Sequence, residues 1–452
     1  MAWAVPLCAA RLRLEVAEMM EKLERLAGFI LSEAKSLGAS FAQCTVSEDE
    51  TKEFNVDGGK FSLMRTLFDR GISITVLKDQ RKGSVQLNRF DEDAVKAAVK
   101  DCIAASESAE PDPAWAFSDK ACILEFTVGE PVCDTDTLFF RTRELLENIA
   151  QRHPKILVEQ MITSHSAGLS VYMNTNGVVY QTHSGAYSFS VMYSAHEGEK
   201  GSSFYSSDVT LACLDRPVID CALMDRELSA VEQQIETIPL GDKFVGTVLL
   251  APQALMEIVL FTILGNFVSD GSLIEGTSIW KDRLNTQVAD PRLTLSVSPY
   301  KAHAVIGEDY THEGFLAQDY DIIRDGKLVR FALSQYGANK TGFERAGSTG
   351  WNLQIPAGTT PFEEMIRKID NGILVMRFSG GQPAPSGEFS GVAKNSFRIK
   401  NGKITGALSE TMISGCVPDM LMHLREISRD VLEDGSVSLP YIAFDGVTVS
   451  GQ

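Results

Sequence analysis

Apolar and polar positions in the first part of the chain follow two different periods. Over residues 20–38, apolar side chains recur every three or four positions, which predicts a helix that ends at Gly38. Alternation then takes over and predicts strands over Phe41–Val46, Thr51–Val56, Gly71–Leu77 and Gly83–Leu87. Asp91 is suited to cap a second helix, and the run Pro111-Asp-Pro113 ends this unit.

The middle of the chain mixes the same two patterns. Helices are expected from about Asp134 to Ala150 and over Ala222–Ile238. Between them, alternation predicts strands over Lys155–Ile162, Gly168–Met173, Val178–His183 and Tyr187–Ser194. Asn174-Thr-Asn-Gly177 supplies the turn residues of a hairpin.

The last part of the chain is dominated by strand patterns. A strand over Phe244–Leu250 precedes a helix at about residues 252–266, which is apolar nearly all round and is therefore expected to be buried. Asp325-Gly326 and Asn401-Gly402 are the turn residues of two predicted hairpins. Two further helices are predicted over Pro361–Asn371 and Pro418–Ser428.

These patterns predict an α+β protein, in which an N-terminal α+β domain with an antiparallel sheet precedes a β-rich C-terminal domain with a few helices. We expect an N-terminal extension at 1–19 and an N-terminal domain at 20–115. A middle segment at 116–241 is expected to pack with that domain, and the C-terminal domain should span 242–452. The first residues lack the basic region of a secretion signal, so a plain extension is favoured.

Composition narrows the classes of function. No apolar run reaches the roughly 18 residues of a membrane span, so no membrane association is expected. The net charge of -18 repels phosphate backbones, which argues against nucleic-acid binding. The eight cysteines lack metal-binding spacing and are expected to be reduced thiols in a cytoplasmic protein.

The residues that usually carry chemistry do not form a recognisable site. None of the seven histidines has a second histidine three to five positions later, so no metal motif is predicted. No nucleotide-binding fingerprint occurs, and no cofactor is expected. Two glycine-rich loops are candidates for lining a cavity or holding an anion, and their residues of interest are Gly347, Ser348, Gly380, Gly381 and Ser386.

Several stretches nevertheless resemble the TldD/PmbA family, historically called modulators of DNA gyrase. In the first segment these are Phe68–Leu77, Lys82-Gly83-Ser84, the helix at Asp91–Ala98 and the Pro111-Asp-Pro113 break. In the last segment, Gly387-Glu-Phe-Ser-Gly391 and Ile399-Lys-Asn-Gly-Lys-Ile404 are most similar to the PmbA (TldE) type. The resemblance covers about residues 20–452 and implies a metallopeptidase-like C-terminal domain.

The active branch of that family carries His-Glu-x-x-x-His on the first helix of the C-terminal domain, and a cysteine near the end. Alignment on Gly276-Thr-Ser278 puts Phe261 and Asn266 at the histidine positions and Thr262 at the position of the glutamate base. Alignment on Ser438-Leu-Pro440 puts Leu432 at the cysteine position. Phenylalanine does not ligate zinc and threonine is no general base near neutral pH, so the resemblance implies that the zinc site is lost.

Three hypotheses follow. The resemblance implies a non-catalytic subunit that pairs with a zinc-bearing TldD-like chain to cleave unstructured peptides, and that forms a homodimer when alone. A second hypothesis is a hydrolase of unrecognised mechanism that uses Ser386, Ser390 or Cys416 with a histidine. A third is a protein that binds peptides or a partner without any peptidase.

Overall fold

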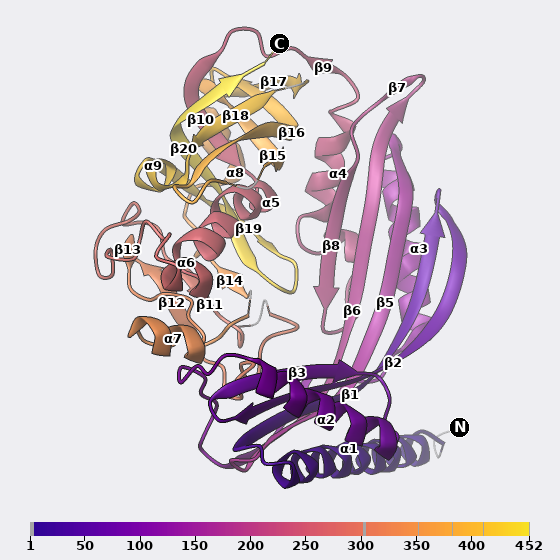
Figure 1. Cartoon of the computed structure of the whole chain (residues 1–452). Helices are drawn as coiled ribbons and strands as arrows, with labels where there is room; N and C mark the ends of the chain where they lie inside the picture. Colours follow the sequence, from indigo (N-terminus) through magenta and orange to yellow (C-terminus); the bar gives the residue numbers. More distant parts are fainter. Residues whose placement is uncertain (1–3, 302–303, 351, 382, 410, 452) are drawn as a thin grey trace.

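Two large sheets with helices packed on them make up the protein (Figure 1). The computed structural model describes residues 4–301, 304–350, 352–381, 383–409 and 411–451, with only the backbone of residues 4–15. An eight-stranded sheet comes from the first half of the chain and a twelve-stranded sheet from the second half. The predicted α+β class is therefore confirmed.

The first sheet has the strand order β3-β2-β1-β5-β6-β4, and β7 and β8 also pair with β6. Its strands are β1 (Phe41–Asp57), β2 (Lys60–Lys78), β3 (Arg81–Leu87), β4 (Cys122–Gly129), β5 (Ile156–Asn174), β6 (Val178–Glu197), β7 (Lys200–Gly201) and β8 (Tyr205–Leu211). β4 runs parallel to β6, while the other neighbours are antiparallel. One sheet thus contains strands from both sides of residue 115.

Strands that the sequence pattern predicted as separate pieces are continuous. β1 runs unbroken through residues 47–50, whose side chains are all polar, because its backbone pairs with β2 on one side and β5 on the other. β5 and β6 continue in the same way through their serine-rich stretches. The alternation of apolar residues disappears in these stretches although the strand does not. β4 and β8 were not predicted.

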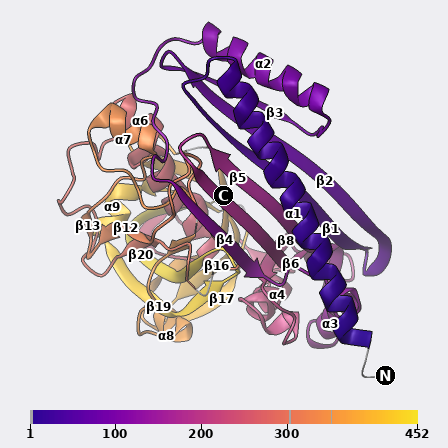
Figure 2. The same ribbon diagram turned by 90° about the horizontal axis from the view of Figure 1, so that it is seen from below.

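Two helices, α1 (Ala4–Ser36) and α2 (Glu92–Ser108), cover one half of this sheet (Figure 2). Buried Leu23, Ile30 and Val99 pack with Ile74 of β2 in a shared core. α1 begins at Ala4 and not near Met20, because residues 4–19 are mostly strong helix formers and Pro6 falls in the first turn, where proline is tolerated. Residues 1–3 of the predicted extension lie outside the described residues.

The other half of the sheet is covered by α3 (Thr135–Arg152), the short η1 (Val218–Asp220) and α4 (Met224–Glu232). The helix predicted over Ala222–Ile238 ends at Glu232, since Thr237 and Ile238 form β9, which pairs with β17 of the second sheet. Side chains on β5 and β6 alternate between buried residues, such as His165 and Phe189, and more exposed ones, such as Ser166 and Ser188. Within the part of the chain that the structure describes, no helix lies on the face that carries these serines (Figure 1).

The second sheet has the order β13-β12-β11-β14-β20-β10-β15-β16-β17-β9, with β18 and β19 beside β20. Its strands are β9 (Thr237–Ile238), β10 (Phe244–Leu250), β11 (Leu295–Val297), β12 (Tyr320–Arg324), β13 (Lys327–Leu328), β14 (Leu353–Gln354), β15 (Asn371–Gly380), β16 (Glu388–Lys400), β17 (Lys403–Leu408), β18 (Met412–Cys416), β19 (Leu424–Glu433) and β20 (Ser438–Ser450). Asn401 and Gly402 both have positive φ, at 46° and 74°, as a tight hairpin turn requires.

Short helices accompany this sheet: α5 (Pro252–Leu255), η2 (Met256–Leu260), η3 (Ile263–Phe267), α6 (Asp270–Ile274), α7 (Gln335–Thr341), α8 (Phe362–Arg367) and α9 (Val417–Met422). The helix predicted over Pro418–Ser428 ends at Met422 because the chain from Leu424 onward pairs with β20. The helix predicted over Pro361–Asn371 ends at Arg367, and Asn371 begins β15. None of the helices in the described residues has the length and apolar character needed to cross a membrane.

A cluster of tyrosines joins the two halves. The ring centroid of Tyr310, in a loop of the second half, lies 5.1 Å from that of Tyr172 and 4.7 Å from that of Tyr180. Tyr180 Oη donates a hydrogen bond of 3.1 Å to the carbonyl of Gly314. Trp115 stacks on Tyr336 of α7, with ring centroids 4.0 Å apart. These aromatic contacts fix the second half against the first sheet.

A substitution at Gly314 tests the packing of the tyrosine cluster between the two halves. Its φ is +80°, and a Cβ there would lie 2.1 Å from Tyr172 Oη, whereas Gly342, with a φ of +79°, has no heavy atom within 4 Å of the same position. We expect Gly342→Ala to cost about 1–2 kcal/mol of unfolding free energy through its backbone alone. Gly314→Ala should cost a further 1–3 kcal/mol or so, because the tyrosine must move. Urea unfolding of the two variants measures the difference, and equal losses would contradict the expectation.

Candidate functional site

The helix at residues 252–267 departs from regular α-helical geometry around the predicted motif positions. Its segments η2 and η3 are π-helical, and they flank Phe261 and Thr262. The Phe261 amide donates to Met256 O, and the Val268 amide donates to Ile263 O over 3.1 Å. Residues five apart point about 140° away from each other on an ideal α-helix. Turns closed by bonds between residues five apart bring such positions toward one side, and they are frequent at functional sites.

The side chains at the motif positions do not fit a zinc ion. Phe261 has no donor atom and is 46% exposed, which also differs from the burial expected all round this helix. Buried Thr262 donates its hydroxyl hydrogen to Ile258 O, 2.5 Å away within the helix. Asn266 donates from Nδ2 to Pro383 O at 3.2 Å and to Ala384 O at 3.1 Å. Among the described residues, no three His, Cys, Asp or Glu side chains are grouped so that they could hold a metal ion.

The structure brings one predicted glycine loop to this helix. Gly380 ends β15, Gly381 follows it, and the carbonyls that Asn266 binds belong to the same loop. At the far end of the loop, a Cβ on Gly387 would lie 2.8 Å from the ring of Phe267, so this glycine allows the loop to pack on the helix. Ser386 is exposed, and its Oγ lies 3.4 Å from Glu388 Oε2. Gln382, within the loop, lies outside the described residues.

The other glycine loop, at residues 347–350, holds a carboxylate of the chain itself. The amides of Thr349 and Gly350 donate to Glu308 Oε2 at 2.7 and 2.9 Å. The hydroxyls of Ser348 and Thr349 also donate to the Glu308 carboxylate. Ser348 is fully buried, and a Cβ on Gly347 would lie 2.5 Å from the carbonyl oxygen of Gln318. Gly347 and Ser348 are therefore part of a turn that binds an anion of the chain itself, the Glu308 carboxylate.

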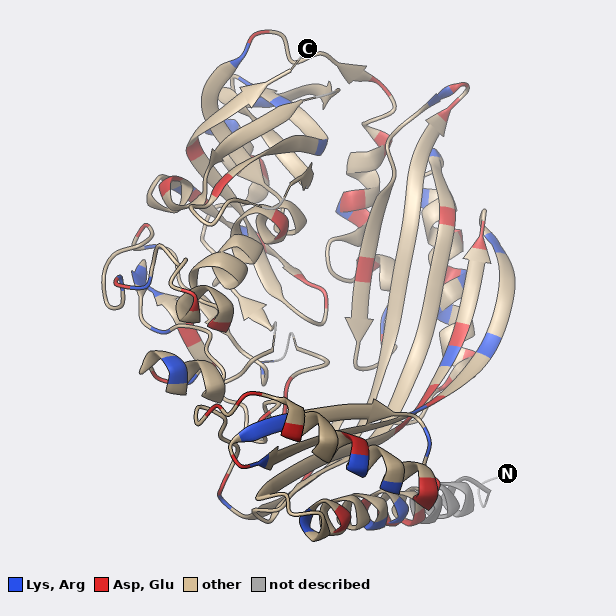
Figure 3. Cartoon of the chain, in the orientation of Figure 1, with Lys and Arg blue, Asp and Glu red and all other residues tan. Residues whose placement is uncertain are grey.

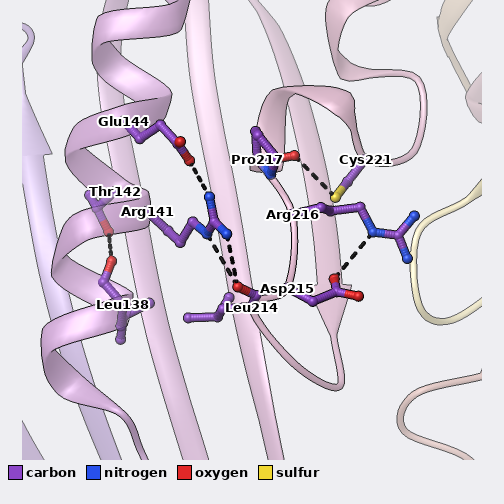
Figure 4. Close-up of polar contacts among 9 residues, drawn as sticks. All are labelled: Leu138, Arg141, Thr142, Glu144, Leu214, Asp215, Arg216, Pro217 and Cys221. Atoms are coloured by element: carbon purple, nitrogen blue, oxygen red, sulfur yellow. Dashed lines mark hydrogen bonds and ion pairs between the residues drawn. The ribbon is translucent and has the colours of Figure 1, made fainter.

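Leu432, at the predicted cysteine position, lies in β19 opposite Leu439 of β20. Its neighbours Val431 and Glu433 line a hollow of about 400 Å³ together with Cys213 and Cys221 of the segment between β8 and α4. Figure 4 shows how that segment is held: Arg141 of α3 donates from Nε and Nη2 to Leu214 O at 3.2 and 3.1 Å. Burial raises the pKa of the Cys221 thiol.

The three nucleophile candidates have no histidine as a hydrogen-bond partner among the described contacts. Cys416 Sγ lies 3.9 Å from Ser386 O, and burial raises the pKa of its thiol, which opposes nucleophilic use. The ring of His423 is engaged through Nδ1 with Asp419 O at 2.8 Å. Ser390 is an exposed residue of β16 that pairs with Ser414.

A larger cavity lies away from all predicted site residues. It has a volume of about 740 Å³ and is bounded by α1, β1, β2, β5 and β6. His165 and His183 line it, and burial lowers the pKa of both imidazoles. His165 Nε2 is hydrogen-bonded to Glu130 O at 2.7 Å, which ties the ring to the entry of α3. No sequence motif marks this cavity, because it is made by residues from five separate elements.

The carboxyl of Glu227, on α4, has a strongly shifted pKa. Ser207 Oγ donates to it at 2.5 Å and Tyr205 Oη at 3.3 Å, and Tyr193 shares a 2.8 Å hydrogen bond with Ser207. Desolvation by burial raises the pKa of Glu227 to about 7. Only the packing of α4 on β8 creates this environment, so the sequence alone held no signal for it.

Two family models match the chain. The PmbA/TldA metallopeptidase C-terminal domain matches residues 245–451, and metallopeptidase domain 1 of the same family matches residues 44–106. The chain is 26% identical over 425 residues to metalloprotease PmbA of Escherichia coli O157:H7, covering 88% of each chain. A PmbA homolog of Haemophilus influenzae is 23% identical over 458 residues, covering 95% of this chain and 96% of that protein. The crystal structure of TldE from Thermococcus kodakarensis has the same fold, with a TM-score of 0.81 at 19% identity over 95% of this chain and 100% of that one.

The anion-binding turn predicts a loss of stability when its carboxylate is removed. Glu308→Ala leaves the Thr349 amide and the Ser348 hydroxyl without this acceptor and removes one of the two acceptors of the Gly350 amide, so we expect a cost of about 1–3 kcal/mol in unfolding free energy. Glu344→Ala is the matched control, because Glu344 is exposed and its ion pair among the described residues is with Arg330 at the surface, where such pairs contribute at most about 1 kcal/mol. Chemical denaturation measures the unfolding free energy of both variants, and Glu308→Ala should lose more than Glu344→Ala.

The raised pKa of Glu227 predicts that the unfolding free energy depends on pH. Because its pKa is raised to about 7 in the folded state from an ordinary value of 4.5, the folded chain holds this proton more tightly than the unfolded chain does. Its contribution to stability is therefore complete below about pH 4.5 and is lost as the pH rises through about 7. Glu227→Gln should flatten the fall in unfolding free energy between pH 5 and 8, whereas Glu199→Gln, at an exposed position, should leave it unchanged. If the unfolding free energies of Glu227→Gln and of the native chain fell equally between pH 5 and 8, the expectation would be wrong.

Proposed function

The chain belongs to the PmbA/TldD metallopeptidase family, and we propose that it is a member without a zinc site that serves as the non-catalytic subunit of a two-chain peptidase. The observation that carries the proposal is the π-helical segment at residues 256–267. The backbone distortion that would bring residues five apart to one side is present, while Phe261, Thr262 and Asn266 occupy the positions of the ligands and the base. In this proposal the backbone geometry of the helix is present, whereas the side chains that would bind zinc are not.

The role of Asn266 supports this proposal. Its amide donates to the carbonyls of Pro383 and Ala384, so the side chain at the second histidine position ties a loop to the helix. Thr262 has its hydroxyl engaged within the helix and is not directed at a substrate. Both polar side chains therefore have structural partners, as expected for a scaffold that has lost its metal.

We assign the peptidase chemistry to a partner, a TldD-like chain with an intact His-Glu-x-x-x-His motif, and unstructured peptides as its substrates. In this proposal the present chain forms one wall of the peptide chamber in a cytoplasmic complex. The helix-free, serine-bearing face of β5 and β6 is suited to such a wall, because short polar side chains leave room for an extended chain. Among the described residues, β8 has a strand neighbour on its β6 side alone. The Thr210 amide at its other edge already donates to Asp434 O, so the proposed peptide would add as a strand beside residues 205–208.

Reconstitution tests the assignment. We expect the purified chain to bind no stoichiometric zinc and to cleave no unstructured peptide by itself, because the donor atoms are missing. Mixed with the intact-motif partner, it should raise peptide turnover above that of the partner alone. Metal analysis and a fluorescent peptide assay measure both. Stoichiometric zinc or robust turnover by this chain alone would refute the proposal.

A restored variant provides the positive control for the position of the site. Phe261→His, Thr262→Glu, Asn266→His and Leu432→Cys together reintroduce the family's donor set. With the positions assigned as proposed, this variant should bind about one zinc per chain through two histidine nitrogens and one cysteine sulfur, with water in the fourth position. The same four positions changed to alanine remove the native side chains without adding donors, and that variant should bind none.

A further inference from the structure

The edge of β8 that faces away from β6 is bound at both of its ends. Figure 1 shows this edge on the side of the second half of the molecule. At one end, the Thr210 amide donates to Asp434 O at 2.7 Å. At the other end, Arg377 Nη1 of β15 donates to Phe204 O at 3.2 Å. Residues of the second half therefore occupy the edge at these two points.

The backbone groups between the two points are unused. In a strand the N–H and C=O of one residue point to the same side, and successive residues point to opposite sides. Because the Thr210 amide and Phe204 O point away from β6, the backbone groups of Ser206 and Asp208 do so as well. No contact within the part of the chain that the structure describes uses these groups. They are therefore available to an added strand.

Arg377 belongs to a pair of cations without an acid. It stands directly opposite Lys394 in the pairing of β15 with β16, and like charges in that position destabilise a sheet. Both side chains are only partly buried, and neither forms an ion pair with another described residue. The charge of Arg377 acts on the Glu257 carboxylate, but that carboxylate accepts from the Phe378 amide at 2.6 Å.

The rest of the chain makes such a pair of cations distinctive. Lys and Arg are interspersed with Asp and Glu along the ribbon (Figure 3), and acids outnumber bases by 60 to 42 in the sequence. Two cations that lie side by side without a carboxylate attract an anion, and an arginine fork binds a carboxylate with particular strength. An anion is therefore expected at this end of the β8 edge.

We propose that Arg377 and Lys394 bind the C-terminal carboxylate of a peptide whose last residues pair with Ser206 and Asp208. In an antiparallel arrangement, the penultimate residue of the peptide exchanges both backbone hydrogen bonds with Ser206. A residue beyond the C-terminal one would have to donate its N–H to Phe204 O, which Arg377 already occupies. The peptide therefore ends there, with its carboxylate beside the guanidinium.

The opposite orientation is less favourable. A parallel peptide would bring its N-terminal ammonium to the two cations and its carboxylate toward the exposed Asp208. Because the Thr210 amide is already bound, an antiparallel peptide can pair over only about four residues. The edge is thus suited to the end of a peptide and not to an internal segment.

This inference rests on the proposed function, because it takes the β8 edge as a peptide site. It adds the class of substrate, which is an unstructured peptide with a free C-terminal carboxylate. All the residues concerned belong to this chain, so binding can be measured without zinc and without a partner. A failed binding test would leave the reconstitution result as it stands, and a failed reconstitution would leave the binding result as it stands.

Peptides that differ at the C-terminus test the role of Arg377. The probe is an unstructured ten-residue peptide with an N-terminal fluorophore, made as the free acid, as the amide, and as an amide that ends in glutamate. In fluorescence anisotropy, the purified chain should bind the free acid at least about tenfold more tightly than either amide. Arg377→Gln should reduce this preference to within about threefold. Arg324→Gln, which removes an exposed arginine of β12, should keep it.

The preference for the free acid separates recognition from folding. A loss of packing at Arg377 would weaken the binding of all three peptides alike and leave their ratio unchanged. Equal binding of acid and amide by the native chain, or an unchanged preference in Arg377→Gln, overturns the proposal. If the amide that ends in glutamate bound as tightly as the free acid, the assignment to the chain terminus would be wrong, because a side-chain carboxylate would suffice.

N-methylated peptides test the antiparallel register. A methyl group on the penultimate nitrogen removes the donor to Ser206 O, and one on the fourth nitrogen from the end removes the donor to Asp208 O. Each should weaken binding by about fivefold in the same assay. The third nitrogen from the end points away from β8, so its methylation is the matched control and should change binding by less than about twofold. Equal effects at all three nitrogens would contradict the register.

Discussion

The continuous backbone pairing of β1 is the constraint on which the first half of the molecule depends. β1 is paired along its length with β2 on one side and with β5 on the other, so its hydrogen bonds hold through the polar stretch at residues 47–50. This stretch separates two cores: α1 and α2 pack on one end of the sheet, and α3 and α4 pack on the other. One sheet therefore supports two helix layers, with backbone bonds and not side-chain burial joining them.

The same sheet sets the position of the second half. Tyr172 and Tyr180, on β5 and β6, receive the Tyr310 loop, while residues of α4 share a core with Tyr441 of β20 and Met365 of α8. Contacts at both ends of the sheet thus hold the twelve-stranded sheet beside it. Among the described residues, no helix lies on the serine-bearing face between these contacts, and this is the face that we propose as a wall for an extended peptide.

The backbone of the motif helix depends on its buried side chains and not on the residues at the proposed ligand positions. The π-helical turns at residues 256–260 and 263–267 are backbone features, sustained by burial of residues such as Ile258 and Ile263 in the core of the second half. Asn266 adds hydrogen bonds to Pro383 O and Ala384 O, so its side chain ties the loop at residues 380–387 to the helix.

The amino-acid sequence by itself determined the α+β class, the helices α2 and α3, the hairpin turn at Asn401-Gly402 and the family, because caps, periodic burial and turn residues are local signals. Tertiary structure alone decided the long strands, the early end of α9 and the anion-binding turn around Glu308. In each case the deciding partner is distant: β5 and β2 for β1, β20 for residues after Leu424, and Glu308 for the amides of Thr349 and Gly350. When the pairing strand or the buried acceptor lies far away in the chain, the local sequence contains no periodic pattern that would predict the contact.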